Sequence, residues 1–91
     1  MKKKIAILGS TGSIGKSTLE VIKKDKKNFD VILLSAKNNY KKLVKQAKEF
    51  KARNILINNK NFFKKTKKLV KKTKIKVFLE MFRLKIFFQE K

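Results

Sequence analysis

One stretch decides the fold of this chain: Ile5-Ala6-Ile7-Leu8-Gly9-Ser10-Thr11-Gly12-Ser13-Ile14-Gly15. Its first four residues form a continuous apolar run of strand length, bounded by charge before it and by glycine after it. Such a run is typical of a central parallel strand that is covered on both faces. The glycines are spaced as G-x-x-G-x-x-G, and a helical pattern begins at once. The stretch therefore predicts a strand, a tight turn of phosphate size and the N-terminus of a helix.

Strand and helix patterns alternate along the rest of the chain. After the first strand and a helix that begins at residue 13, we expect a strand at 29–34, a polar loop at 35–39, a helix at 40–50, a strand at 55–57, a helix at 62–70 and an edge strand at 74–79. This alternation predicts right-handed β-α-β units. The expected fold class is α/β, a partial Rossmann-like parallel sheet of three to four strands with helices on both faces.

The composition of the 91 residues is strongly basic, with 27 lysines and arginines, 6 acidic residues and a formal net charge of +21. This charge is compatible with a nucleic-acid-binding module, which stays open as an alternative. It is not the favoured one, because only Arg53 and Arg83 are arginines, and recognition of bases and phosphates favours the forked guanidinium. The chain has no cysteine and no histidine, which excludes disulfides, thiolate catalysis and the common zinc sites.

The N-terminus gives the expected location. Met-Lys-Lys-Lys is followed by only four apolar residues before Gly9. A secretory signal needs about 7–15 apolar residues and a membrane span about 20. The sequence shows neither pattern, and we expect a cytoplasmic protein with no membrane role.

The glycine turn is the candidate site. Gly9 permits a sharp exit from the strand, Gly12 allows the backbone to approach a pyrophosphate, and Gly15 lets the helix pack closely on the sheet. Free amides and the helix dipole would then hold the anion. The hydroxyls of Ser10, Thr11 and Ser13 can add donors. The residues expected to bind the cofactor in this turn are Gly9, Ser10, Thr11, Gly12, Ser13, Ile14 and Gly15.

The residues after the second strand indicate which dinucleotide is bound. NAD-binding turns usually have an acidic residue about 20 positions beyond the glycines, to accept from the ribose 2′-hydroxyl. This chain has Ser35-Ala36-Lys37-Asn38-Asn39 there. Because a lysine and two amides can bind a 2′-phosphate, we expect the cofactor to be NADP(H) rather than NAD(H).

A mononucleotide site is a further alternative. Gly15-Lys16-Ser17 supplies the Gly-Lys-Ser of a P-loop, which would bind ATP or GTP. That motif also needs a glycine five positions before Gly15, where this chain has Ser10. ATP binding through Lys16 and Ser17 is therefore the least favoured of the three functions.

Three segments resemble the opening of 1-deoxy-D-xylulose 5-phosphate reductoisomerases: residues 4–15, 17–22 and 34–39. The string Gly-Ser-Thr-Gly-Ser-Ile-Gly, with this continuation, is far more specific than the general glycine fingerprint. The resemblance runs from residue 2 to residue 77 and weakens after Ile57.

The resemblance implies a cofactor, a metal and a reaction. The family uses NADPH and a divalent metal, magnesium or manganese, to rearrange and reduce 1-deoxy-D-xylulose 5-phosphate to 2-C-methyl-D-erythritol 4-phosphate, in the non-mevalonate isoprenoid pathway. The positions implied as cofactor contacts are Thr11, Gly12, Ser13, Ile14, Lys37, Asn38 and Asn39. In the second group the family usually has glycine, a basic residue and asparagine.

The rest of the family pattern has no counterpart in this chain. Family members run to several hundred residues, with the metal ligands, the substrate phosphate site and a histidine-bearing flap beyond the first hundred. No acidic residue here falls in a matching motif, so no catalytic and no metal-binding residue is assigned. The sugar phosphate substrate and the homodimer of the family are expectations for the full-length proteins only.

The last residues depart from the family. We expect a partial NADPH-binding domain at 1–79 and an aberrant apolar and basic tail at 80–91, produced by a frameshift or truncation near residue 79. The strand that would build the other wall of the dinucleotide crevice is then missing. Weak cofactor affinity and an inactive chain are the expected consequences.

Overall fold

The computed structural model describes residues 2–79. Its elements, in chain order, are β1 (Lys3–Ile7), α1 (Ser13–Lys23), the short 3-10 helix η1 (Lys26–Asn28), β2 (Phe29–Ala36), α2 (Tyr40–Phe50), β3 (Asn54–Ile57), α3 (Lys60–Leu69) and β4 (Lys76–Phe78). Every predicted strand and helix is present within a few residues of its expected bounds. The expectation for the tail at 80–91 lies outside the described residues.

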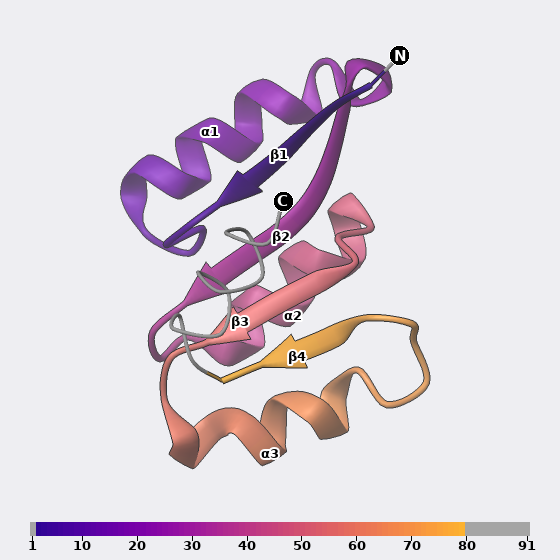
Figure 1. Ribbon diagram of the computed structural model, residues 1–91. Helices are drawn as coiled ribbons and strands as arrows, with labels where there is room; N and C mark the ends of the chain where they lie inside the picture. The colour runs from indigo at the N-terminus through magenta and orange to yellow at the C-terminus, as the bar shows by residue number, and fades with distance from the viewer. Residues whose placement is uncertain (1, 80–91) are drawn as a thin grey trace, which may run out of the picture.

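The four strands form one parallel sheet in the order β1-β2-β3-β4, so that β1 and β4 are its edges (Figure 1). Ile7 is paired with Leu34. Ala36 is paired with Ile57. The carboxyl ends of the first three strands therefore lie together at one edge of the sheet. The predicted α/β class, the parallel sheet and the edge position of the last strand are confirmed.

The three helices lie on the same face of this sheet. Leu19 of α1, Leu43 of α2 and Val70 after α3 belong to one core cluster, together with Ile7 and Ile55 of the strands. The prediction of helices on both faces is therefore wrong for the described residues. Each right-handed crossover moves one strand further in the same direction, which puts every helix on the same side.

The core is built from the apolar stripes that the sequence shows. Its fully or nearly buried members are Ile7, Leu19, Ile22, Val31, Leu34, Ala36, Leu43, Val44, Ala47, Ala52, Ile55, Ile57 and Val70. A second, smaller cluster of Leu33 and Leu56, with Ile32 and Phe78 against it, lies apart from the main core. Tyr40 and Phe62 stack with ring centroids 5.0 Å apart and connect α2 to α3.

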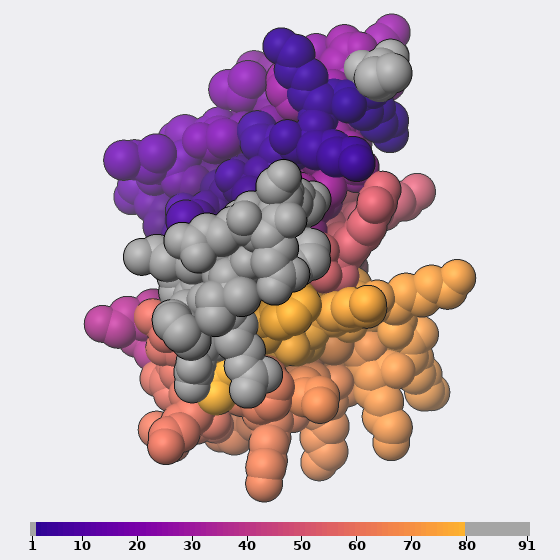
Figure 2. Space-filling view, in the orientation of Figure 1, coloured from indigo at the N-terminus to yellow at the C-terminus, as the bar shows by residue number. Residues whose placement is uncertain are grey.

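Much of the positive charge is solvated. The lysines of α3 are exposed, and in the space-filling view long side chains project one by one from this helix at the lower border of the molecule (Figure 2). Within residues 2–79, no helix has both the length and the apolar character needed to cross a bilayer.

Asn59 is the N-cap of α3, and we expect its replacement by alanine to destabilise the fold. Its side-chain oxygen accepts from the Asn61 backbone N–H at 2.9 Å, and its amide donates to the Asn38 side chain at 2.7 Å. Loss of such a cap costs about 1 kcal/mol. Urea unfolding followed by circular dichroism measures the change. Asn61→Ala on the exposed first turn is the control, and equal stabilities of the two variants would contradict the assignment.

Candidate functional site

The glycine turn connects β1 to α1 in the way the sequence predicts. Gly9 has φ of +71°, a left-handed conformation that favours glycine. The Gly12 N–H donates to the Gly9 carbonyl at 3.1 Å and closes the turn. Gly15 is buried, and a Cβ placed on it would lie 2.5 Å from the Ser10 Cα and would also meet the Gly9 carbonyl oxygen. The helix therefore packs directly against the backbone of the turn.

The N-terminus of α1 keeps its amides available. Its N-cap is Gly12, which has no side chain to accept from them, whereas Asn39 caps α2 and Asn59 caps α3. The first bond of α1 runs from the Lys16 N–H to the Gly12 carbonyl at 2.9 Å, so the amides of residues 13–15 precede it. These amides and the positive end of the helix dipole form a site of the kind that binds phosphate.

The Ser10 side chain is more deeply buried than the other hydroxyl side chains of the turn. It is fully buried, and its Oγ–H donates to the Gln46 Oε1 at 2.8 Å, whereas Thr11 is half-buried and Ser13 is exposed. Ser35 holds the turn from the other side: its Oγ accepts from the Gly9 N–H at 3.0 Å and its carbonyl accepts from the Ser10 N–H at 2.8 Å. Ser10 thus contributes to the site by fixing the turn.

The carboxyl end of β2 lies against this turn, because Ser35 is bonded to both Gly9 and Ser10, and the loop at 37–39 follows directly. The two amide side chains of this loop are used within the fold. Asn39 accepts from the Lys42 N–H at 3.3 Å as the cap of α2, and Asn38 accepts from the Asn59 side chain at 2.7 Å.

Lys37, in the same loop, is exposed and makes no ion pair within the part of the chain that the structure describes. Of the three loop residues predicted to contact the cofactor, it has the side chain that is left to bind an anion.

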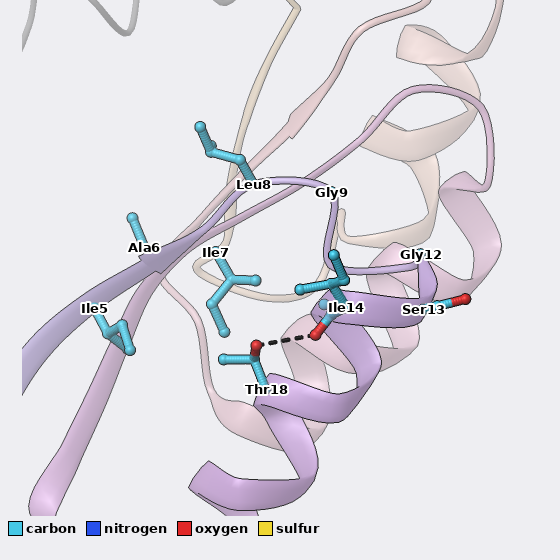
Figure 3. Close-up of a pocket in the computed structure, with 10 residues that line it drawn as sticks. Ile5, Ala6, Ile7, Leu8, Gly9, Gly12, Ser13, Ile14 and Thr18 are labelled. Atoms are coloured by element: carbon cyan, nitrogen blue, oxygen red, sulfur yellow. Dashed lines mark hydrogen bonds between the residues drawn. The ribbon is translucent and has the colours of Figure 1, made fainter.

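An open hollow of about 600 Å³ lies along β1 and the first turns of α1 (Figure 3). This volume is within the range of small-molecule sites. The residues that line it are Ile5, Ala6, Ile7, Leu8, Gly9, Gly12, Ser13, Ile14, Gly15 and Thr18. Ile14 is 84% exposed at its rim, and Leu8 points away from the helix. Five of the seven predicted turn residues, Gly9, Gly12, Ser13, Ile14 and Gly15, thus line this hollow, whereas Ser10 and Thr11 do not.

The charges around the turn favour an anionic ligand. The proximity of Lys16 of α1 lowers the pKa of Lys42 of α2, and desolvation and the charge of Lys45 act in the same direction. A phosphate near these ammonium groups would relieve their mutual repulsion. Within residues 2–79, no three acidic, histidine or cysteine side chains come together in a way that could hold a metal ion.

Gln46 is the residue of this site that sequence reasoning missed. It is buried on α2, and besides accepting from Ser10 it donates from Nε2 to the Ser10 carbonyl at 3.0 Å. Its position three residues after Leu43 and one before Ala47 puts it on the apolar stripe of the helix. A glutamine on such a stripe is a signal that a buried polar partner exists, although the partner cannot be named from spacing.

A parallel sheet with a glycine turn at the carboxyl end of β1 and uncapped amides beyond it defines a Rossmann-type α/β protein. Comparison with known proteins agrees. Residues 5–88 match the family model for 1-deoxy-D-xylulose 5-phosphate reductoisomerase, and this chain belongs to that family.

The relatives are similar in sequence and in structure. The reductoisomerase of Pelagibacter ubique (strain HTCC1062) is 55% identical over 76 residues, which are 84% of this chain and 20% of that protein. The one from Wolbachia sp. subsp. Brugia malayi is 47% identical over 75 residues, which are 82% of this chain and 19% of that protein. A structure from Zymomonas mobilis in complex with NADPH superposes with a TM-score of 0.84 at 29% identity, covering 87% of this chain and 21% of that one.

A further reductoisomerase structure, in complex with NADPH, fosmidomycin and magnesium, also gives a TM-score of 0.84, at 26% identity and with 90% of this chain and 20% of that chain covered. The chain thus spans about a fifth of the length of the curated relatives it matches. The match supports neither nucleic-acid binding nor ATP binding as the main function.

Proposed function

We propose that this chain is the NADPH-binding part of a 1-deoxy-D-xylulose 5-phosphate reductoisomerase. The observation that carries the proposal is the uncapped N-terminus of α1 behind the glycine turn, in a chain of this family. Two of the similar structures are complexes with NADPH. The residues of this chain fit that cofactor, because the hollow lies against the turn and the loop beside it carries no acidic residue.

The proposed contacts follow from the geometry of the turn. The amides of Thr11, Ser13 and Ile14 bind the pyrophosphate, while Gly12 leaves room for it to approach. Lys37 binds the 2′-phosphate, and Asn38 and Asn39 shape the loop that presents it. Gly9 and Gly15 set the backbone of the turn, and Ser10 anchors it.

The reaction belongs to the whole enzyme. NADPH supplies a hydride when bound, and the proposed product of the full-length protein is 2-C-methyl-D-erythritol 4-phosphate. The described residues bring together no metal ligands, so we propose no metal-dependent step for them. The cytoplasmic location, the domain bounds and the origin of the tail stay predictions from the sequence.

Thermal unfolding with each cofactor tests the proposal. At a concentration about ten times its Kd, NADPH should add about 1.4 kcal/mol to the free energy of unfolding. For a domain of this size, that raises the melting temperature by about 6–11 °C. NADH at the same concentration should raise it less. The measurement needs physiological salt, because the net charge of +21 attracts any polyanion at low ionic strength.

Lys37→Gln identifies the residue that discriminates the cofactors. We expect it to reduce the NADPH shift to that of NADH, because the 2′-phosphate loses its cation. Lys48→Gln is the matched control, since it removes the same charge from an exposed position in the last turn of α2. Equal shifts with NADPH and NADH in the unmodified chain would contradict the proposed function.

A further inference from the structure

Gln46 and Ser10 make a reciprocal pair of hydrogen bonds between α2 and the glycine turn. The Ser10 Oγ–H donates to Oε1 of Gln46, and Nε2 of Gln46 donates to the Ser10 carbonyl, at 2.8 and 3.0 Å. Both residues are buried: Ser10 is 0% exposed and Gln46 is 8% exposed. A buried amide bonded in both directions has one orientation, so the position of the Ser10 carbonyl is fixed by the helix.

This bond also fixes the next amide of the chain. The Ser10 carbonyl and the Thr11 N–H belong to one planar trans peptide, in which the two groups point in opposite directions. Because the carbonyl points inward at Gln46, the Thr11 N–H points away from the interior. The Gly9 and Ser10 amides, by contrast, are both bonded to Ser35. Within residues 2–79, the Thr11 amide is bonded to no acceptor.

We propose that Gln46 is a positioning residue of the NADPH site, which aims the Thr11 N–H at a phosphate of the cofactor. The inference rests on the proposed function, and it assigns a role to a residue that does not itself touch the cofactor. Nε2 of Gln46 holds the Ser10 carbonyl inward, and the rigid peptide transmits that orientation to the donor. An apolar side chain at this place would fill the same space and leave the peptide free to rotate.

Gln46→Glu tests the role, because it keeps the size of the side chain and an acceptor for Ser10 but replaces the Nε2 donor. At pH 8 we expect the Kd for NADPH to rise about tenfold, the effect of losing one hydrogen bond to a charged group. Burial raises the pKa of such a carboxyl. Its protonation toward pH 5.5 restores a donor to the Ser10 carbonyl, so the ratio of variant Kd to wild-type Kd should fall with pH.

The matched control is Asn54→Asp, the same amide-to-carboxyl change elsewhere in the fold. The Asn54 side chain donates to the Ile32 carbonyl at 2.9 Å, at the amino end of β3 and away from the turn. It should lower stability and leave the Kd unchanged at a temperature where the chain is folded. Gln46→Met, which has no donor at any pH, should weaken binding without recovery in acid. Equal Kd values for the wild type, Gln46→Glu and Gln46→Met would overturn the proposal.

Residual dipolar couplings of the ligand-free chain separate this inference from the proposed function. In the wild type, the Thr11 N–H vector should have the outward orientation described above, and it should change in Gln46→Met but not in Asn54→Asp. If NADPH fails to bind the wild type, the proposed function is contradicted, and the vector still reports on Gln46. A Thr11 N–H that points inward in the wild type, or that is unaffected by Gln46→Met, would overturn the positioning role.

Discussion

Replacement of Gly12 by aspartate is expected to stabilise the fold slightly and to abolish most NADPH binding. At the N-cap of α1, a carboxylate can accept from the amides that glycine leaves free. It also lies at the positive end of the helix dipole, and together these effects stabilise the fold by about 0.5 kcal/mol. The backbone accepts the change, since φ is −80° and a Cβ would meet only the Gly9 carbonyl oxygen, at 3.5 Å.

The same carboxylate accepts hydrogen bonds from the amides that we propose for the pyrophosphate, and its negative charge repels that of the pyrophosphate. Two like charges about 4 Å apart near a protein surface repel by up to about 4 kcal/mol, so a hundredfold or greater loss of affinity is expected. Urea unfolding and NADPH titration of the same sample measure the two effects. Gly12→Ala serves as the control, because it adds a Cβ without a charge. Gly12→Asp with unchanged NADPH affinity would show that the pyrophosphate does not bind at this helix.

Gly15→Ala is expected to lower the free energy of unfolding by about 3 kcal/mol. The added Cβ would lie 2.5 Å from the Ser10 Cα and 2.8 Å from the Ser10 carbonyl carbon, and would also meet the Gly9 carbonyl oxygen. All three are backbone atoms, which cannot turn aside as a flexible side chain can. Forcing extra volume into such a contact costs about 1–3 kcal/mol or more. Against a total stability of about 5–14 kcal/mol, this is a large loss.

The sign of this effect is diagnostic. In an unconstrained helix, glycine to alanine stabilises by about 1 kcal/mol through helix propensity. A loss at Gly15 therefore reports the contact between α1 and the turn, and a gain would show that the helix does not lie against Ser10. The midpoint of urea unfolding gives the answer, and Gly12→Ala again is the control, since its Cβ has room.

Local patterns in the sequence predicted the elements of this fold because each is fixed by a short-range property. The apolar run before Gly9 and the spacing of the apolar residues in 40–50 and 62–70 indicate their strand and helices without reference to partners. The glycine turn was predictable for the same reason. The left-handed conformation of Gly9 and the close approach at Gly15 are both required by the geometry of this one turn.

The arrangement of the helices depended on the order of the strands. Local sequence does not state whether each crossover moves to the same side of the preceding strand. In this chain every step goes the same way, from β1 to β4, and the helices share one face for that reason.

The sequence by itself thus determined a phosphate-sized turn at a helix N-terminus, its family and the lack of an acidic residue after β2. Only the tertiary structure decided which side chains around the turn are bonded within the fold and which are left free to bind a ligand. Ser10 faces Gln46, the two asparagines of the loop are used within the fold, and Lys37 is left exposed. The physical reason is that the partner of a polar side chain decides its role. The partners of Ser10 and Asn38 lie 36 and 21 residues away in the chain, and Asn39 has its partner at the start of α2.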